Sequence, residues 1–236
     1  MENDLLVKIV KKSEIGKGLY KFSLASNELL NGKAGEYIEV RVVDKSGIDT
    51  YKKVPIFNID KESQIVEFIV DSADEDSKII SGYEIGDLIG AKGPKGDSFD
   101  TETKYNSVSI IAEGKNAFPI YEVAKELKGN ASLNVYLEFN SKDDVVLERE
   151  IEEIGVNKLC ITTIDGSYKE SGNVSRFMMQ DIKEHMVEKI FATGSKEFLK
   201  DIKAFAEENN IKVEAIIDNK STENGFVVDL KNESLD

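Results

Sequence analysis

Apolar and polar residues alternate along the first hundred positions of the chain. Within residues 36–44 (EYIEVRVVD), Ile38, Val40 and Val42 fall on one side of an extended chain. This period of two is typical of a strand with one buried face. Similar runs occur at residues 5–10, 19–24, 64–70 and 87–93, with Gly, Asn, Asp and Ser between them. Because turn residues separate these short runs, we expect a small antiparallel β-barrel or sandwich.

From Ser107 onward, apolar runs are separated by helix-like segments. The runs occupy residues 107–111, 132–139, 157–164, 188–193 and 211–217. Alternation of strand and helix favours a parallel, doubly wound sheet. We therefore expect a Rossmann-like α/β domain to follow the barrel.

Residues 195–210 (SKEFLKDIKAFAEENN) give the clearest helix prediction. Their apolar residues recur at helical spacing and form one stripe: Phe198, Leu199, Ile202, Phe205 and Ala206. Ser195 precedes this stripe and can accept a hydrogen bond from the first turn, so we expect it to cap the helix.

A polar stretch at residues 100–106 (DTETKYN) has no apolar periodicity and predicts the domain boundary. We accordingly divide the chain into a barrel at residues 1–101, a Rossmann-like domain at 102–220 and a polar C-terminal tail at 221–236. Within the tail, the FVVDL run at residues 226–230 predicts a last strand.

The acidic composition limits the classes of partner. The 236 residues include 31 Lys and Arg against 45 Asp and Glu, a net charge of −14. Such a surface repels nucleic-acid phosphates and anionic lipids, so we expect neither nucleic acid nor a membrane as partner. No stretch approaches the ~20 apolar residues that span a bilayer, and the start lacks the order of a signal peptide. We expect a cytoplasmic protein.

Cysteine and histidine each occur once, as Cys160 and His185. One cysteine excludes an intrachain disulfide and a thiolate-held metal built from this chain alone. A Ser/His triad would depend on His185, which lies in a Met-flanked, helix-like run, and a helix-face histidine is the favoured interpretation. We expect no metal site.

Two kinds of segment are candidates for ligand binding. Residues 52–59 (KKVPIFNI) place two cations before a proline, which suits a pyrophosphate but also suits an edge strand protected by lysines. In the α/β half, small or polar residues follow three apolar runs, at Gly114, residues 165–167 and residues 193–195. Ligands bind at the carboxyl ends of such strands, although every doubly wound domain must also turn there.

Together these segments resemble the ferredoxin-NADP⁺ reductase superfamily over nearly the whole chain. Within it, the chain most resembles the electron-transfer subunits of dihydroorotate dehydrogenase and their sulfide dehydrogenase relatives. The resemblance implies a barrel that binds FAD, a Rossmann-like half that binds NAD(P)H, and a partner oxidoreductase subunit.

The flavin motifs of that family align with two segments of the barrel. Arg-Arg-Pro-Ile-Ser aligns with residues 53–57 (KVPIF), so a lysine replaces the arginine fork and a phenylalanine replaces the serine. Gly-Lys-Gly-Thr aligns with residues 74–77 (DEDS), which brings three carboxylates to a place that faces a diphosphate. The implied flavin contacts are Lys53, Pro55, Ile56, Phe57, Asp76 and Ser77.

The nucleotide motifs match unevenly. GPKGDSF at residues 93–99 and DGSY at 165–168 are close to the family pattern, whereas a Gly-Gly-Gly-Ile-Gly loop has become AEGKN at 112–116. The Ala-Cys-Gly-Pro motif is ATGS at 192–195, without the cysteine that faces the nicotinamide. The implied nucleotide contacts are Gly114, Asp165, Gly166 and Gly194.

The family's four cluster cysteines should follow residues 216–218, and none is present, so we expect no [2Fe-2S] cluster. Three functions stay open. The first is a flavin-dependent NAD(P)H oxidoreductase or electron-transfer subunit, in which no side chain need act as a catalytic base. The second is a descendant with few or no cofactors that serves as an interaction or regulatory subunit. The third is a protein that binds only a nucleotide.

Overall fold

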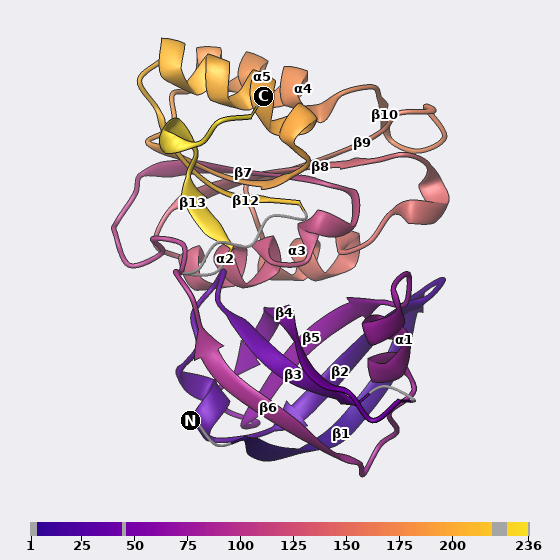
Figure 1. Ribbon diagram of the computed structural model, residues 1–236. Helices are drawn as coiled ribbons and strands as arrows, with labels where there is room; N and C mark the ends of the chain where they lie inside the picture. The colour runs from indigo at the N-terminus through magenta and orange to yellow at the C-terminus, as the bar shows by residue number, and fades with distance from the viewer. Residues whose placement is uncertain (1–3, 44–45, 219–225, 236) are drawn as a thin grey trace. The chain divides into compact units, whose positions relative to one another are not determined.

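The computed structural model describes residues 4–43, 46–218 and 226–235 of the chain. The chain falls into two units, residues 1–96 and 97–236, each with its own sheet and hydrophobic core (Figure 1). In these described ranges, no helix has the length and apolar character needed to cross a bilayer.

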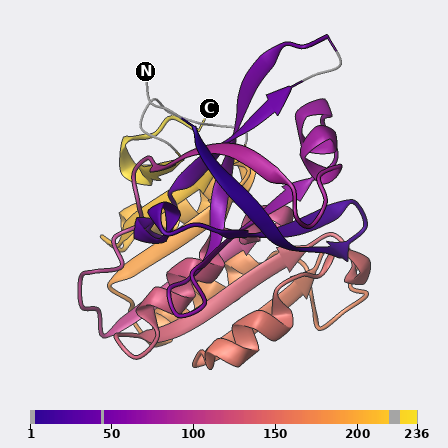
Figure 2. The same ribbon diagram turned by 90° about the horizontal axis from the view of Figure 1, so that it is seen from below.

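Six antiparallel strands close the first unit into a barrel, in the order β1-β2-β5-β4-β3-β6, with β6 pairing back to β1. Their bounds are β1 (Leu5–Gly16), β2 (Leu19–Ala25), β3 (Tyr37–Val43), β4 (Asp49–Asp60), β5 (Ile65–Asp71) and β6 (Leu88–Lys95). A short 3₁₀ turn, η1 (Glu28–Asn31), and one helix, α1 (Glu75–Ser81), complete the unit. Seen from below, the strands curl around the barrel and α1 lies beside them (Figure 2). The predicted barrel is confirmed.

The alternation in β3 explains how the barrel fills its interior. Ile38, Val40 and Val42 are fully buried, as their spacing predicts. Phe22 of β2 and Phe68 of β5 stack at the centre with ring centroids 5.2 Å apart. These side chains belong to one apolar cluster that also receives Ile80 of α1.

The second unit is a seven-stranded sheet in the order β10-β9-β8-β7-β11-β12-β13. Its strands are β7 (Ser107–Glu113), β8 (Ser132–Phe139), β9 (Lys158–Thr163), β10 (Glu170–Ser171), β11 (Lys189–Gly194), β12 (Lys212–Ile217) and β13 (Val227–Asp229). Its helices are α2 (Ile120–Leu127), α3 (Glu148–Ile154), α4 (Val174–Glu184) and α5 (Lys196–Glu208), with 3₁₀ turns η2 (Gly114–Ala117), η3 (Lys142–Asp144) and η4 (Leu230–Asn232). Figure 1 shows α2 and α3 on one face of the sheet and α4 and α5 on the other.

Strand order reverses between β7 and β11. The chain runs from β7 outward through β8 and β9, then returns to β11 on the other side of β7 and continues to β12. All of these strands pair in parallel, and only β13 is antiparallel to its neighbour β12. The expected doubly wound domain is confirmed. The carboxyl ends of β7 and β11, where the strand order reverses, are named the crevice because open α/β sheets bind their ligands at such a place.

Several local predictions hold in this unit. Helix α5 buries Leu199, Ile202, Phe205 and Ala206 and packs Phe198 partly against the same core. The Ser195 hydroxyl accepts the Phe198 N–H at 3.2 Å, which is the predicted cap. Residues 226–230 contain the predicted strand, β13. Of the polar tail predicted at residues 221–236, residues 221–225 and 236 lie outside the described residues.

The segment at residues 93–99, which matches the family's Gly-Pro motif, begins inside a strand. Gly93, Pro94 and Lys95 are the last residues of β6, and Lys95 pairs with Tyr37 of β3. Gly93 has φ +122°, and a Cβ there would lie 3.1 Å from the Tyr37 carbonyl oxygen. Glycine is therefore needed at residue 93 because the backbone of a neighbouring strand passes so close.

We predict that Phe68→Ala lowers the free energy of unfolding of the barrel by about 3 to 5 kcal/mol, because it removes a fully buried ring that stacks on Phe22. Amide hydrogen exchange of barrel peptides in urea measures this loss. Leu6→Ala is the control, since Leu6 is 71% exposed and its removal should change the free energy by less than about 0.5 kcal/mol. Equal effects of the two substitutions would contradict the packing of the barrel core.

Candidate cofactor site

The lysine-proline segment lies in β4 of the barrel. Residues of this strand pair with β3 from Asp49 to Pro55 and with β5 from Ile56 onward. Lys52 and Lys53 therefore pair with β3. This pairing is compatible both with a pyrophosphate site and with a strand protected by lysines. The Lys53 ammonium lies 4.9 Å from the centre of the Tyr37 ring.

The predicted flavin contacts in β4 differ in their exposure. Lys53 and Pro55 are partly exposed, whereas Ile56 and Phe57 are buried. Val54, which stands where the family motif has its second arginine, is buried in the barrel core. Because Lys52 of the same segment is bonded to Asp74, Lys53 is the cation that can offer its charge to a ligand.

The first turn of α1 is capped by a carboxylate of the chain itself. Asp74 accepts hydrogen bonds from the Ser77 N–H at 3.0 Å and from the Ser77 hydroxyl at 2.8 Å. The Lys52 ammonium donates to the same carboxylate at 2.9 Å. Asp76 lies in the same turn and is partly exposed, while Ser77 is buried. The predicted contact Ser77 is therefore already bonded to Asp74.

These bonds control the charge of Asp74. Burial of the carboxyl group acts to raise its pKa, but the bonds from Lys52 and Ser77 outweigh burial and hold the pKa at about 2. Asp74 is consequently ionised across the physiological range and forms an ion pair with Lys52.

At the crevice of the second unit, Glu113 occupies the position beside Gly194. The preceding residues of their strands, Ala112 and Thr193, are paired in register. A carboxylate oxygen of Glu113 (Oε2) accepts the Ser195 N–H at 2.8 Å, at the start of α5. A Cβ on Gly194 would lie 3.2 Å from this oxygen and 2.5 Å from Phe198 Cδ1. The close approach that glycine permits here is thus filled by side chains of the chain.

Gly114 contributes a backbone conformation. It has φ +56°, and a Cβ there would meet nothing within 4 Å. Glycine is favoured at residue 114 for its left-handed backbone, which turns the chain from β7 into η2.

A second carboxylate, Glu138, lies next to Glu113 in the sheet. The two residues are paired in register at the ends of β7 and β8. Glu138 is 7% exposed and accepts the N–H of Val174, the first residue of α4, at 2.7 Å. Burial raises its pKa, the Val174 bond opposes that rise, and the charge of Glu113 adds to it. Glu138 is not among the residues that the sequence motifs predicted, although a glutamate near the end of an apolar strand is a visible signal.

The DGSY turn closes on itself at the end of β9. Asp165 accepts the Ser167 N–H at 2.9 Å and the Ser167 hydroxyl at 2.6 Å, and both Asp165 and Gly166 are exposed. The Tyr168 hydroxyl donates to Glu148 at 2.9 Å. Strand β9 is three strand positions from β11, about 14 Å at the usual spacing. The structure therefore brings Gly114 and Gly194 together at one crevice and leaves Asp165 and Gly166 farther along the sheet edge.

The single histidine and cysteine lie apart from the crevice carboxylates. His185 follows the last residue of α4 and is exposed. Cys160 is buried in β9, and burial raises the pKa of its thiol to about 11. Among the described residues, no group of three or more His, Cys, Asp and Glu side chains is placed to hold a metal ion.

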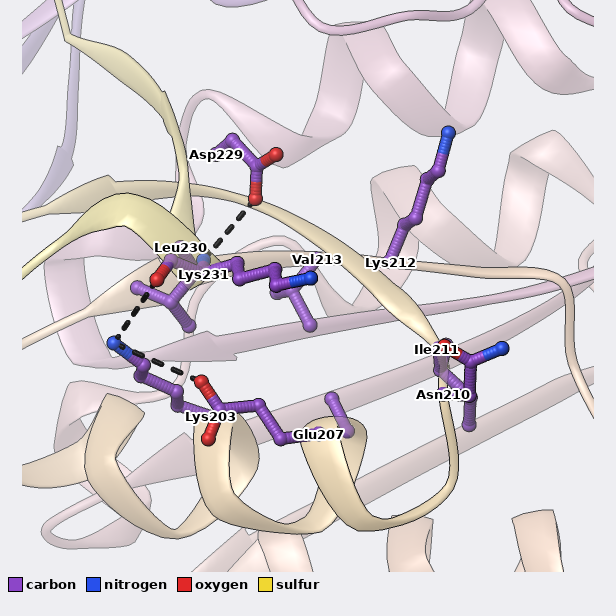
Figure 3. Close-up of a pocket in the computed structure, with 10 residues that line it drawn as sticks. Lys203, Glu207, Asn210, Ile211, Lys212, Val213, Asp229, Leu230 and Lys231 are labelled. Atoms are coloured by element: carbon purple, nitrogen blue, oxygen red, sulfur yellow. Dashed lines mark hydrogen bonds and ion pairs between the residues drawn. The ribbon is translucent and has the colours of Figure 1, made fainter.

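A pocket of about 470 Å³ lies on another part of the α/β unit (Figure 3). It is lined by residues of α5, β12, β13, η4 and the turn between α5 and β12, and includes three lysines: Lys203, Lys212 and Lys231. Lys203 donates to the Glu233 carbonyl oxygen at 2.6 Å. Because Lys212 begins β12, the pocket lies at the amino end of that strand, whereas the crevice lies at the carboxyl ends. No predicted site residue lines it.

Solved structures define the class of the fold. The NADH-dependent reduced ferredoxin-NADP oxidoreductase, described in relation to flavin-based electron bifurcation, is similar with a TM-score of 0.78 and 21% identity, covering 94% of this chain and 80% of that one. The flavohem-like FAD/NAD binding domain of nitric oxide dioxygenase from Vibrio cholerae gives a TM-score of 0.72 at 13% identity, covering 92% of this chain and 99% of that one. The chain therefore has the ferredoxin reductase-like fold of a barrel followed by a Rossmann-like domain.

Curated relatives identify the family within that class. The electron transfer subunit of dihydroorotate dehydrogenase B (NAD(+)) from Streptococcus mutans is 30% identical over 195 residues, 81% of this chain and 74% of the relative. The subunit of the same name from Fusobacterium nucleatum is 27% identical over 208 residues, 85% of this chain and 80% of the relative. No protein-family model matches. The chain belongs to the family of dihydroorotate dehydrogenase electron-transfer subunits, as the sequence motifs indicated.

The depressed pKa of Asp74 leads to a prediction about acid stability. Because the folded-state pKa is below the ordinary value of 3.8, Asp74 stabilises the fold above about pH 4, and this contribution disappears as the pH falls toward about 2. The side chain is 54% exposed, so solvent screening limits the contribution to about 1 kcal/mol.

Asp74→Asn keeps a capping side chain but removes the charge. We expect the variant to be less stable than the parent by about 1 kcal/mol near neutral pH and equally stable near pH 2, as measured by urea unfolding across that range. Asp76→Asn is the control, since it removes a charge from the same turn and leaves the bonds of Asp74 in place. A difference for Asp74→Asn that does not change with pH would contradict the ion-pair interpretation.

Proposed function

We propose that this protein is the electron-transfer subunit of a flavin- and NAD(P)H-linked oxidoreductase and works beside a catalytic partner subunit in the cytoplasm. The family relationship carries the proposal. The match to the Streptococcus mutans subunit extends over 195 residues, which is longer than either unit of the chain, so it includes parts of both. An electron-transfer role needs both units, one for each cofactor.

In this proposal the barrel binds the flavin and the α/β unit binds the nucleotide. Lys53 supplies a positive charge beside Tyr37 on the barrel, and Pro55 adds a rigid apolar surface next to it. On the α/β unit, Gly114 and Gly194 form the crevice where a nucleotide would approach. The flavin supplies the redox chemistry when bound, and the side chains bind and orient it.

Two places where a cofactor diphosphate is expected, the start of α1 and the start of α5, do not fit one in the conformation described. At the start of α1, the Ser77 donors are bonded to Asp74, and at the start of α5, the Ser195 N–H is bonded to Glu113. Like charges about 5 Å apart repel by roughly 1 to 3 kcal/mol at effective dielectric constants of about 20 to 80. A diphosphate would therefore require these carboxylates to move, and we derive no chemical step through either cofactor.

The same observation supports a second candidate function. A subunit that has lost its cofactors would keep the barrel and the sheet for a protein contact. Acidic side chains could then occupy the helix starts where cofactor phosphates would otherwise bind. Asp74 and Glu113 are two such residues. The two functions differ in whether the purified protein carries or takes up a flavin.

Absorbance separates these functions. An electron-transfer subunit should be yellow, with an absorbance band near about 450 nm, and should gain thermal stability with FAD or NADH. A ligand at about 100 times its dissociation constant adds about 2.7 kcal/mol of stability. Colourless protein whose melting temperature is unchanged by excess FAD and NADH would exclude the electron-transfer role and leave the cofactor-free subunit.

The acidic segment beside α1 leads to a second prediction. Asp74→Gly combined with Asp76→Gly removes two carboxylates from the segment that aligns with a flavin motif, so FAD should bind more tightly. Fluorescence quenching of FAD measures the dissociation constant. Glu62→Gln combined with Glu208→Gln removes the same net charge from exposed positions outside this segment and is the matched control. Unchanged titration curves for the glycine variant would mean that the segment lies away from the flavin.

A further inference from the structure

The crevice between β7 and β11 contains a helix N-terminus that already holds an anion. Helix α5 has thirteen residues, and its first N–H groups point toward the strand ends. The Phe198 N–H is satisfied by the Ser195 hydroxyl, and the Ser195 N–H is satisfied by the Glu113 carboxylate. This carboxylate takes the position that a phosphate takes at such a helix start.

A row of polar side chains continues from Glu113 across the sheet. Glu113 is paired in register with Glu138, and Glu138 with Thr162. Ile111, Tyr136 and Cys160, two positions earlier on each strand, belong to the core beneath α4 and α5, so the three polar side chains lie on that same face. The row therefore faces the starts of α4 and α5.

Thr162 gives an independent sign that this row can receive a ligand. Its hydroxyl is fully buried and, like those of Ser109 and Thr193, has no hydrogen-bond partner among the residues described. Of these three hydroxyl groups, that of Thr162 lies in the row. Buried hydroxyl groups are nearly always bonded, and an orphan one in a polar row calls for a partner group. The row thus joins two anion-capped helix starts to an unsatisfied hydroxyl.

We propose that Glu113 is a specificity-determining residue of the α/β unit: its carboxylate stands in for a ligand phosphate at the start of α5 and weakens the binding of NAD(P)H. The inference rests on the proposed nucleotide-binding function and adds the residue that limits it. Removing the carboxylate frees the Ser195 N–H and removes a charge that repels the diphosphate.

Glu113 suits this role better than Glu138. Glu138 is buried and bonded to Val174, so its removal leaves a donor without a partner inside the protein. Glu113 is only partly buried, and a Cβ on the next residue, Gly114, would meet no atom within 4 Å. A ligand can therefore replace the Glu113 carboxylate at the Ser195 N–H without opening the core.

The test uses the full chain with Glu113→Ala and Glu113→Gln. Glu113 has an extended backbone, φ −109° and ψ 121°, so alanine introduces no strain. We expect Glu113→Ala to bind NADH and inorganic pyrophosphate at least about tenfold more tightly than the parent, as measured by calorimetry. Glu113→Gln removes the charge and keeps the bulk, so its gain should be smaller.

Glu197→Gln is the matched control. Glu197 lies in the first turn of α5 with a side chain 89% exposed, so the substitution removes one charge near the same helix start without opening the crevice. A gain for Glu113→Ala that exceeds the gain for Glu197→Gln supports the proposal. No gain in NADH or pyrophosphate binding by a folded Glu113→Ala protein, or a gain equal to that of the control, overturns it.

Failure of the proposed function gives a different pattern. The flavin absorbance of the parent protein does not depend on Glu113 and reports on the electron-transfer role alone. A colourless parent together with tighter pyrophosphate binding by Glu113→Ala would support the inference while removing the flavin role.

Discussion

The hydrogen bond from the Ser195 N–H to the Glu113 carboxylate ties together the two central strands of the α/β unit. Parallel strands bring their carboxyl ends to one edge of the sheet, and the helices that follow begin there with unpaired N–H groups. These groups attract anions. Glu113 satisfies one of them at the start of α5, and Glu138 satisfies another at the start of α4.

The barrel uses the same solution at a separate place. Asp74 caps α1 through Ser77 and pairs with Lys52 of β4. Bonds to an ionised group are worth about 1.5 to 3 kcal/mol when buried, whereas an exposed ion pair contributes less. In both units a carboxylate of the chain satisfies N–H donors at the start of a helix.

The acidic composition agrees with this use of carboxylates at helix starts. A net charge of −14 disfavours the binding of any further anion. The start of a helix is among the most stabilising locations for a carboxylate. The relationship to dihydroorotate dehydrogenase electron-transfer subunits is therefore compatible with a chain that keeps the fold of the family and differs from the family motifs at residues 74–77 and 112–116.

Local patterns in the sequence were sufficient for much of this structure. Strand β3 follows from an alternation of period two, and α5 follows from its apolar stripe and the Ser195 cap, because each depends on neighbours within a few residues. The sequence also showed that side chains fill the loop at residues 112–116.

Tertiary structure decided which groups meet. Glu113 and Ser195 are 82 positions apart, and Glu138 and Val174 are 36 apart, so their bonds exist only after β7, β8 and β11 have taken their order in the sheet. The same order places Asp165 away from Gly194, although both residues follow apolar runs and were predicted to lie at one ligand-binding edge of the sheet. The sequence by itself determined the elements and the family, and the order of the parallel strands determined the partners, because hydrogen bonds between distant segments depend on topology rather than on local preference.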